Sequence, residues 1–320
     1  MSEKLLEKIQ KLAARGKKVD PKTLRELVEI RRAPNGRWLV VPKGAPTAQK
    51  RMSMQTLEAS ADLHGILDIH RAFKEQRYRR MIKNPKYHGP KIVAEGDSWF
   101  EYPLTNDILM WLGERYAVLS LAKAGDSWQE IIHQNELYGT IKKEKPDIVL
   151  LSVGGNDVLG SVGEYVNDND PNLAPEDCIK KKLFGDLLDG TEKIYRDVTA
   201  KIVAMGAQVI LHGYDYPDPR PWNEGGYLIG GPLERLKFGG VGMWRRIVNA
   251  MLVQFNDRLA QVADGNKVHF KKLLRTIGTD DILTGPDASN WNDEVHGSDK
   301  GFQALATQLG DKIAEIYPAA

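Results

Sequence analysis

Apolar residues after position 90 fall into short unbroken runs, separated by longer stretches with helical periodicity. Runs that lack apolar–polar alternation are typical of strands buried on both faces, and helices between such strands are typical of a parallel sheet. The pattern predicts strands near 92–94, 117–121, 148–153, 209–211 and 268–270, and helices near 106–115, 127–144, 190–205, 243–264 and 300–316. We therefore expect an α/β fold over residues 90–320, a three-layer α/β/α domain with a five-stranded parallel sheet.

The first 89 residues carry a different pattern, in which apolar residues recur at spacings of three and four. Helices are predicted over residues 1–15, from the cap at Asp20 through Ile30, and over residues 54–82. A turn at 34–36 leads into a short predicted strand over 37–41, and Pro and Gly residues over 84–90 indicate a linker. The pattern predicts a mostly helical N-terminal domain over residues 1–89.

The formal net charge of +2 hides a strong asymmetry between the two parts of the chain. Residues 1–90 carry 21 Lys and Arg against 9 Asp and Glu, whereas residues 91–320 carry 24 against 34. The basic segment has three interpretations: it packs on the acidic domain of its own chain, it binds a protein partner or a second copy, or it binds nucleic acid or an anionic membrane. Its basic residues are interspersed with acidic ones, which disfavours the last of these.

Several features bear on the compartment. The longest apolar run, near 148–153, is far shorter than the roughly 20 residues that span a bilayer, and the N-terminus lacks the apolar stretch of a secretory signal. A single cysteine, Cys178, excludes an internal disulfide and fits a reducing compartment. We expect a cytoplasmic protein. No cluster of His and Cys has the spacing of a zinc site, so we expect no zinc.

Polar blocks follow the first three predicted strands, and a fourth lies near the C-terminus. They span residues 95–99, 123–127, 154–157 and 291–297. In open α/β sheets, ligands bind beyond the carboxyl ends of the strands, which is where the first three blocks fall. The four blocks therefore carry the candidate chemistry.

The blocks Gly96-Asp97-Ser98, Ala124-Gly125-Asp126, Gly155-Asn156-Asp157 and Asp293-Glu294-Val295-His296 occur in this order. In that order they resemble the SGNH/GDSL hydrolase family of serine esterases and lipases, over about residues 91–316. The resemblance implies a flavodoxin-like sheet and hydrolysis of an acyl ester through an acyl-serine, with no cofactor. Family substrates include simple carboxylesters, lipids, thioesters and O-acetylated sugars.

The candidate catalytic residues are Ser98, Asp293 and His296. A serine hydroxyl needs an adjacent base, for which His296 is the candidate, and Asp293 can bond the other ring nitrogen three residues away. The resemblance assigns the oxyanion hole to the backbone N–H groups of Ser98 and Gly125 and to the side-chain amide of Asn156. The aspartates that flank two of these residues, Asp97 and Asp157, are expected to bond loop backbone and hold the shape of the site.

The tetrapeptide Gly-Asp-Ser-Trp occurs twice, at 96–99 and at 125–128, so Ser127 is a rival nucleophile. If Ser127 were the nucleophile, no glycine block would lie between it and Asn156. With Ser98 in that role all four blocks are filled, and Ser127 is expected to cap the following helix.

Two segments, 158–190 and 214–242, are longer than the fold requires and are expected to overhang the site. Four tryptophans in or near site-edge segments are candidate substrate-binding residues that would line an acyl or sugar pocket: Trp99, Trp128, Trp222 and Trp291. An alternative is that some of them only pack the loops. The composition of the second segment favours a small or medium acyl ester as the substrate. The rival to an esterase is a catalytically silent binding or scaffold protein, targeted by its basic N-terminal domain.

Overall fold

The computed structural model describes most of the chain from residue 70 onward. The described residues are 28–32, 38–42, 70–102, 104–167, 173–224, 226, 228–237, 239–273 and 288–318. The helix predicted over 1–15 and the first part, 54–69, of the helix predicted over 54–82 lie outside these residues. The division into domains at residues 89 and 90, and any partner of the basic segment, stay predictions.

Strand β1 (Val28–Arg32) pairs antiparallel with strand β2 (Trp38–Pro42), with Ile30 opposite Val40. The strand predicted at 37–41 is therefore present, but the helix predicted through Ile30 is wrong at its end. The sequence of β1, Val-Glu-Ile-Arg-Arg, starts with an apolar–charged alternation of period two, which suits a strand better than a helix.

The central sheet has five parallel strands in the order β4-β3-β5-β6-β7, which confirms the predicted architecture. Their bounds are β3 (Lys91–Gly96), β4 (Ala117–Ser120), β5 (Ile148–Ser152), β6 (Gln208–Gly213) and β7 (Val268–Lys272). All side chains of β4 and β5 are buried, as expected for strands with helices on both faces. The chain leaves β3 toward β4 and returns to β5, so a crevice is expected between the carboxyl ends of β3 and β5.

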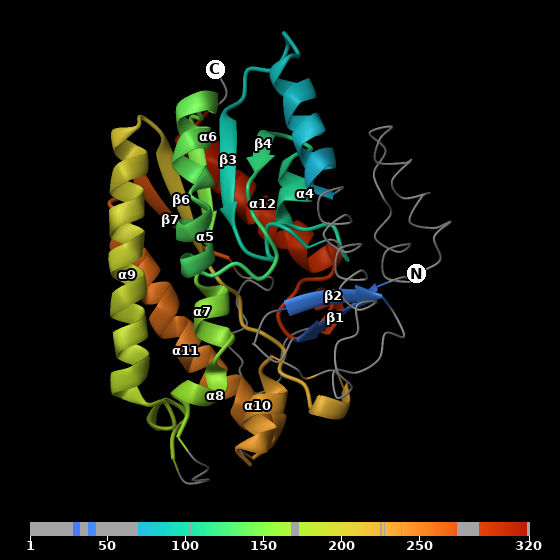
Figure 1. Ribbon diagram of the computed structural model, residues 1–320, viewed down its shortest axis with the longest axis vertical. Helices are drawn as coiled ribbons and strands as arrows, with labels where there is room; N and C mark the ends of the chain where they lie inside the picture. The colour runs from blue at the N-terminus through green and yellow to red at the C-terminus, as the bar shows by residue number, and fades with distance from the viewer. Residues whose placement is uncertain are drawn as a thin grey trace.

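Helices cover the two faces of this sheet (Figure 1). One face carries α4 (Ile108–Leu112) and α12 (Asp299–Ile316), which pack against each other. The other carries α5 (Trp128–Gln134), α6 (Glu136–Glu144), α9 (Lys181–Ala204) and α11 (Gly240–Val262). Shorter elements lie in the connections: α7 (Gly155–Leu159), α8 (Val162–Tyr165), α10 (Gly230–Arg235), and the 3-10 turns η1 (Pro175–Asp177), η2 (Trp222–Glu224) and η3 (Ala288–Asn290).

Two predicted boundaries differ from the structure. The helix predicted over 127–144 is divided at Asn135, which has a left-handed φ of 50° and ends α5. Helix α9 begins at Lys181 rather than near 190, so the long connection after β5 is shorter than expected. Its first turns bury Phe184 and Leu188, and this tertiary packing extends the helix beyond its clearest periodic stretch.

Residues 70–82 are helical and pack on the α/β unit. Tyr78 is buried in the same core as the sheet, and its hydroxyl donates to Glu144 at the end of α6 (3.0 Å). The Lys74 side chain of this helix is also buried, against Phe100 and Asp107. This part of the predicted N-terminal domain is thus continuous with the core of the hydrolase fold.

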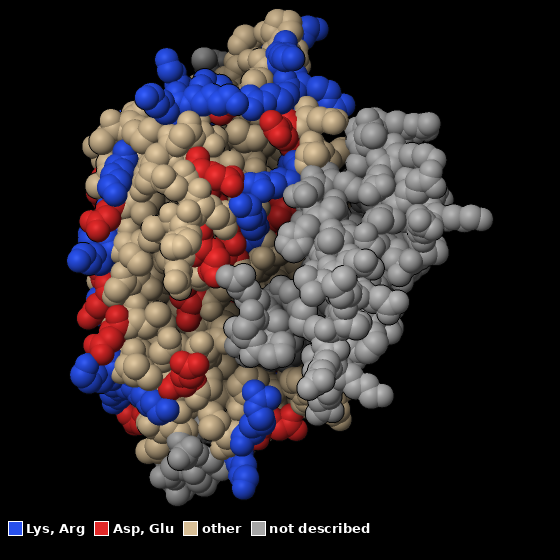
Figure 2. Space-filling view, viewed as in Figure 1, with Lys and Arg blue, Asp and Glu red and all other residues tan. Residues whose placement is uncertain are grey.

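Charged side chains are unevenly spread over the visible face (Figure 2). Lys and Arg gather at the end of the molecule where α6 ends and β3 begins, with exposed lysines at 83, 86, 142, 143 and 145. That end is opposite the carboxyl ends of the strands. Among the described helices, none is both long and apolar enough to cross a bilayer.

Candidate active site

Ser98 lies in a tight turn directly after β3. The turn is anchored by the Asp97 N–H, which donates to the Ser152 carbonyl (2.8 Å), and by the Asp97 carbonyl, which accepts from the N–H groups of Phe100 and Glu101 (3.1 Å each). The sequence favours this turn because Gly96 allows a close approach: a Cβ there would lie 2.4 Å from the Ser152 carbonyl oxygen. Ser98 is therefore held at the carboxyl end of the sheet.

Ser98, His296 and Asp293 form a continuous hydrogen-bonded row. His296 Nε2 lies 2.7 Å from Ser98 Oγ, and His296 Nδ1 lies 2.9 and 2.8 Å from the two carboxylate oxygens of Asp293. His296 and Asp293 are both buried, while the bond to Ser98 is partly open to solvent. These are the contacts that a nucleophile, a base and an orienting carboxylate require.

Hydrogen bonds within the loop over residues 291–297 fix its shape. Asp293 Oδ1 accepts from the backbone N–H of Val295 (3.0 Å) and of His296 (2.8 Å), and the Asn292 N–H donates to the His296 carbonyl (2.8 Å). Burial alone would raise the pKa of the Asp293 carboxyl. The charge of His296 and these hydrogen bonds outweigh burial and hold that pKa below its usual value. Asp293 is therefore ionised at neutral pH.

Tyr102 is part of this arrangement, although no motif in the sequence indicated it. Its ring stacks on the His296 imidazole, with centroids 4.0 Å apart and planes 12° apart. Its hydroxyl donates to Asp293 Oδ2 (2.8 Å) and accepts from Asn292 Nδ2 (2.9 Å). Tyr102 thus contacts both His296 and Asp293, and only the tertiary structure brings these residues together.

The three sequence-predicted oxyanion-hole residues follow β3, β4 and β5: Ser98 and Gly125 lie in loops, and Asn156 lies in the first turn of α7. Gly125 has a φ of 88°, in the left-handed region that favours glycine. The N–H groups of Ser98 and Gly125 donate no hydrogen bond to another described residue. One N–H of the Asn156 amide donates to the Asp126 carbonyl (2.9 Å), which fixes the side chain and leaves its second N–H available.

Asp97 and Asp157 bond loop backbone in the structure. Asp97 Oδ1 accepts from the Trp99 N–H (3.0 Å) and from Ser152 Oγ (3.0 Å), and Asp97 Oδ2 accepts from the Tyr214 hydroxyl (2.5 Å). Asp157 accepts from the Trp128 N–H (3.3 Å). Burial raises the pKa of each carboxyl to about 6.

Ser127 is the N-cap of α5 and belongs to a capping box with Glu130. The Glu130 carboxylate accepts from the Ser127 backbone N–H (3.0 Å) and also from its hydroxyl. The second Gly-Asp-Ser-Trp copy therefore supplies a helix start, whereas the serine of the first copy faces His296.

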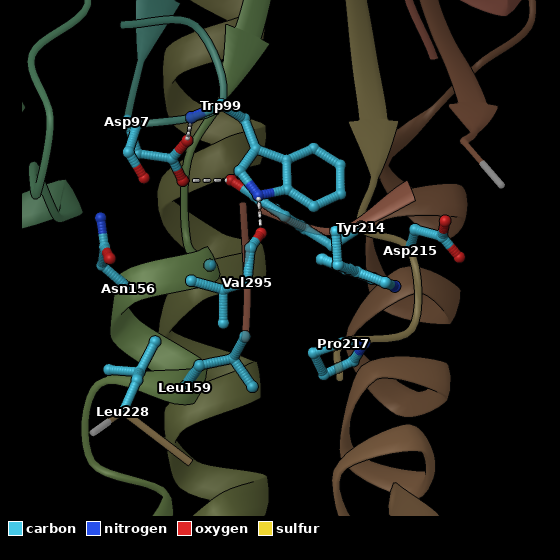
Figure 3. A pocket seen from close by; sticks show the side chains of 12 residues that line it. Asp97, Trp99, Asn156, Leu159, Tyr214, Asp215, Pro217, Leu228 and Val295 are labelled. Carbon is cyan, nitrogen blue, oxygen red and sulfur yellow. Dashed lines mark hydrogen bonds between the residues drawn. The ribbon is translucent and has the colours of Figure 1, made fainter. Parts of the chain in front are cut away.

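A small pocket opens beside Ser98, with a cavity volume of about 20 Å³. Figure 3 shows Asn156 and Leu159 of α7 on one side and Tyr214 and Pro217 on the other. The Trp99 indole N–H donates to the Val295 carbonyl (3.0 Å), which fixes one wall. The full lining is Asp97, Ser98, Trp99, Gly155, Asn156, Leu159, Tyr214, Asp215, Pro217, Leu228, Trp291 and Val295.

Two of the four candidate tryptophans, Trp99 and Trp291, line this pocket, and the other two lie elsewhere. Trp128 is buried in the first turn of α5, edge-on to Tyr195 at 4.6 Å between centroids. Trp222 is 62% exposed. Trp128 therefore points into the helix layer and Trp222 lies on the surface, and their role as substrate-binding residues stays a prediction.

Glu294 joins the loop over residues 291–297 to the pocket wall, a contact that the sequence did not indicate. Its fully buried carboxylate accepts four backbone N–H bonds of 2.7–3.1 Å, from Arg220, Leu228, Ile229 and Gly230. Burial raises the pKa of this carboxyl despite the four donors. Leu228 itself lines the pocket, so Glu294 positions part of the wall.

No curated protein matched the sequence. A protein from Slackia heliotrinireducens assigned to the SGNH hydrolases is 16% identical, with a TM-score of 0.44, covering 70% of this chain and 98% of its own. An acetylxylan esterase from Geobacillus stearothermophilus, solved as a catalytic mutant, is also 16% identical, with a TM-score of 0.44, covering 70% of this chain and 94% of its own.

The model of the GDSL-like lipase and acylhydrolase family matches residues 93–304, about two thirds of the chain. This range starts within β3 and ends within α12, so it contains all four polar blocks. The chain therefore belongs to the GDSL-like lipase/acylhydrolase family of serine ester hydrolases.

Proposed function

We propose that this protein hydrolyses esters of short acyl groups through an acyl-Ser98 intermediate, with His296 as the base and Asp293 as the residue that orients it. The observation that carries the proposal is the row from Ser98 Oγ through His296 to the Asp293 carboxylate, with contacts of 2.7–2.9 Å. Each contact has the length that proton transfer or imidazole orientation requires.

In the first half of the reaction, Ser98 Oγ attacks the ester carbonyl carbon while its proton moves to His296 Nε2. The carbonyl oxygen becomes an oxyanion that faces the N–H groups of Ser98, Gly125 and Asn156. When the intermediate collapses, the bond to the leaving alkoxy group breaks, and His296 returns the proton to that oxygen. The products of this half are a free alcohol and acyl-Ser98.

In the second half, a water molecule gives a proton to His296 Nε2 and its oxygen attacks the acyl carbon. The bond to Ser98 Oγ then breaks, and His296 returns the proton to that oxygen. The released product is a carboxylic acid. Throughout the cycle, Asp293 keeps Nδ1 protonated and stabilises the imidazolium.

Replacing Asn156 by Ala is expected to lower kcat by a factor of about 10²–10³, because one oxyanion donor is lost. KM for p-nitrophenyl acetate should change little, since the donor acts on charge that develops in the transition state. Steady-state kinetics measures both constants. Asn167→Ala is the matched control, because its amide bonds the Asp177 carbonyl on an exposed connection. An Asn156 variant with a raised KM and an unchanged kcat would contradict the oxyanion role.

The pocket supports a short acyl group as substrate. A cavity of about 20 Å³ holds little more than a water-sized group, and its walls are largely apolar. We expect kcat/KM to fall by at least about tenfold from p-nitrophenyl acetate to the butyrate and further to the octanoate, because a longer chain meets the walls. Equal rates across this series would contradict the small-acyl assignment.

Two leucines of the segment 214–242 test whether the pocket wall limits the size of the acyl group. Leu228→Ala enlarges the pocket and should raise the rate on butyrate relative to acetate. Leu233→Ala removes an equally buried leucine that does not line the pocket, and should leave this ratio unchanged. If no ester is turned over and a fluorophosphonate probe does not label Ser98, the binding-protein alternative is favoured instead.

A further inference from the structure

A buried ionic cluster is centred on Lys74 of the helix over residues 70–82. Tyr102 connects it to the loop over residues 291–297, which we call the catalytic loop. The Lys74 ammonium donates to Glu101 Oε2 (2.8 Å), to Asp107 Oδ2 (2.6 Å) and to the Phe100 carbonyl (2.6 Å). Its side chain is only 1% exposed, and the two carboxylates are buried as well. His70 Nδ1 bonds the second oxygen of Glu101 (2.5 Å).

The composition of this cluster could suggest a metal site, because His70, Glu101 and Asp107 each offer a ligand atom within 4.8 Å of the others. The contacts of Lys74 favour a different interpretation. Its ammonium lies within hydrogen-bond distance of both carboxylates and supplies the positive charge that a cation would bring. The cluster is therefore a group of ion-paired side chains rather than a set of metal ligands.

The cluster contacts both ends of residues 100–102 and 104–107, which we call the bracket segment. The three Lys74 bonds hold its start at Phe100 and Glu101 and its end at Asp107. Asp107 also accepts from the N–H of Tyr102 (3.1 Å) and caps α4 through the Met110 N–H (2.9 Å). The backbone of Tyr102 is thereby fixed from the side that faces the helix.

The opposite side of the bracket segment contacts the loop that carries the acid–base pair. Tyr102 stacks on His296 and donates to Asp293, as described above. Thr105 Oγ1 donates to the Gly297 carbonyl (3.3 Å), and the Asn106 N–H donates to Asp299 Oδ1 (2.6 Å). The bracket segment thus lies between the helix of residues 70–82 and the catalytic loop, and contacts both.

Buried ion pairs are weak contributors to stability, because desolvation offsets much of their attraction. Buried ion pairs do fix the positions of their partners. A buried charge without its partner is very unfavourable, and the two groups therefore stay together. Here the partners are the helix of residues 70–82, which lies outside the family-matched range of 93–304, and the bracket segment inside it.

We infer that Lys74 is a positioning residue for ester hydrolysis, which holds Tyr102 against the Asp293–His296 pair through the bracket segment. The inference rests on the proposed function, since it concerns the same acid–base pair. It gives a role in activity to the helix of residues 70–82, which lies outside the four polar blocks.

The test compares Lys74→Met, Tyr102→Phe and the double variant in the full-length protein, with p-nitrophenyl acetate as substrate. Lys74→Met should lower kcat by about ten- to a hundredfold, because a displacement of about 1 Å at the acid–base pair has an effect of this size. KM should stay within about twofold, because the acyl pocket is untouched. The double variant should lose much less than the product of the two single losses, because Lys74 acts through Tyr102.

Tyr78→Phe is the matched control, since it removes a partly buried hydrogen bond of the same helix, to Glu144 and not to the bracket segment. It should keep the wild-type kcat. The inference is overturned if a folded Lys74→Met protein keeps its kcat, if Tyr78→Phe loses as much, or if the losses of Lys74→Met and Tyr102→Phe multiply.

If Lys74→Met does not fold, the charge-balanced variant Lys74→Met with Glu101→Gln replaces it. This variant keeps the Asp107 cap of α4 and the Tyr102 N–H bond while it removes the Lys74 contacts, so the same outcomes apply. Fluorophosphonate labelling of Ser98 in the wild-type protein separates the two proposals. Absent labelling contradicts the proposed function, whereas normal labelling with an unaffected Lys74 variant contradicts only this inference.

Discussion

Replacing Ser98 by Ala is expected to lower kcat for p-nitrophenyl acetate by about 10⁴- to 10⁶-fold, the largest effect of any single substitution in this protein. The side chain removed is the one that His296 Nε2 contacts at 2.7 Å, so no acyl-enzyme can form. The residual rate would come from the oxyanion hole and substrate binding alone. Steady-state kinetics and mass spectrometry after fluorophosphonate treatment measure the loss of turnover and of covalent labelling.

Ser127→Ala is the matched control, because Ser127 stands in the same tetrapeptide and its hydroxyl bonds Glu130 at the start of α5. This variant should lose about 1 kcal/mol of stability through the weakened cap and keep most of its activity. Thermal unfolding measures the first effect and the ester assay the second. If Ser127→Ala were inactive and Ser98→Ala active, the nucleophile would be misassigned.

Asp293→Asn is expected to lower kcat by about 10⁴-fold, with little change in KM. An asparagine keeps an oxygen for the backbone N–H groups of Val295 and His296, so the loop should retain its shape. The new amide cannot stabilise a protonated His296, and it can accept from Nδ1 only with its single oxygen. The expected loss therefore falls on the chemical step, which pre-steady-state kinetics of the acylation burst measures.

The control for this substitution is Asp147→Asn. Asp147 also accepts a backbone N–H, from Lys91 (2.8 Å), but at the start of β3, far along the sheet from Ser98. This variant should keep the wild-type kcat. If both variants lost activity equally, a general loss of structure would explain the result better than a role in catalysis.

Much of the fold could be predicted because its signal is local. The unalternating apolar runs of β3, β4 and β5 require a sheet covered on both faces, and the polar blocks must then meet at its carboxyl edge. The helix ends were harder, since Asn135 ends α5 by a left-handed conformation that the apolar periodicity does not indicate. Residues 28–30 belong to strand β1, as their period-two pattern indicates, although the spacing of apolar residues before them predicts a helix through Ile30.

The supporting residues of the site could not be predicted, because their contacts join distant parts of the chain. Tyr102 meets Asp293 across 191 positions, and Lys74 meets Asp107 across 33. Nothing in the neighbourhood of either residue in the sequence marks it as a partner of the catalytic loop. Trp128 and Trp222 do lie in segments that the sequence places near the site. The positions of their rings depend on tertiary packing, which composition does not reveal.

Glu294 has a consequence for how this enzyme distinguishes its substrates. Asp293 is followed directly by Glu294, whose carboxylate accepts from the backbone N–H of Leu228 and of three nearby residues, so we expect a displacement of the wall to reach Asp293. An acyl group that is too long would push the wall and, with it, tilt the imidazole away from Ser98. Oversized esters would then be bound but turned over slowly, and selectivity would be expressed as a change of rate after binding rather than as exclusion from the pocket.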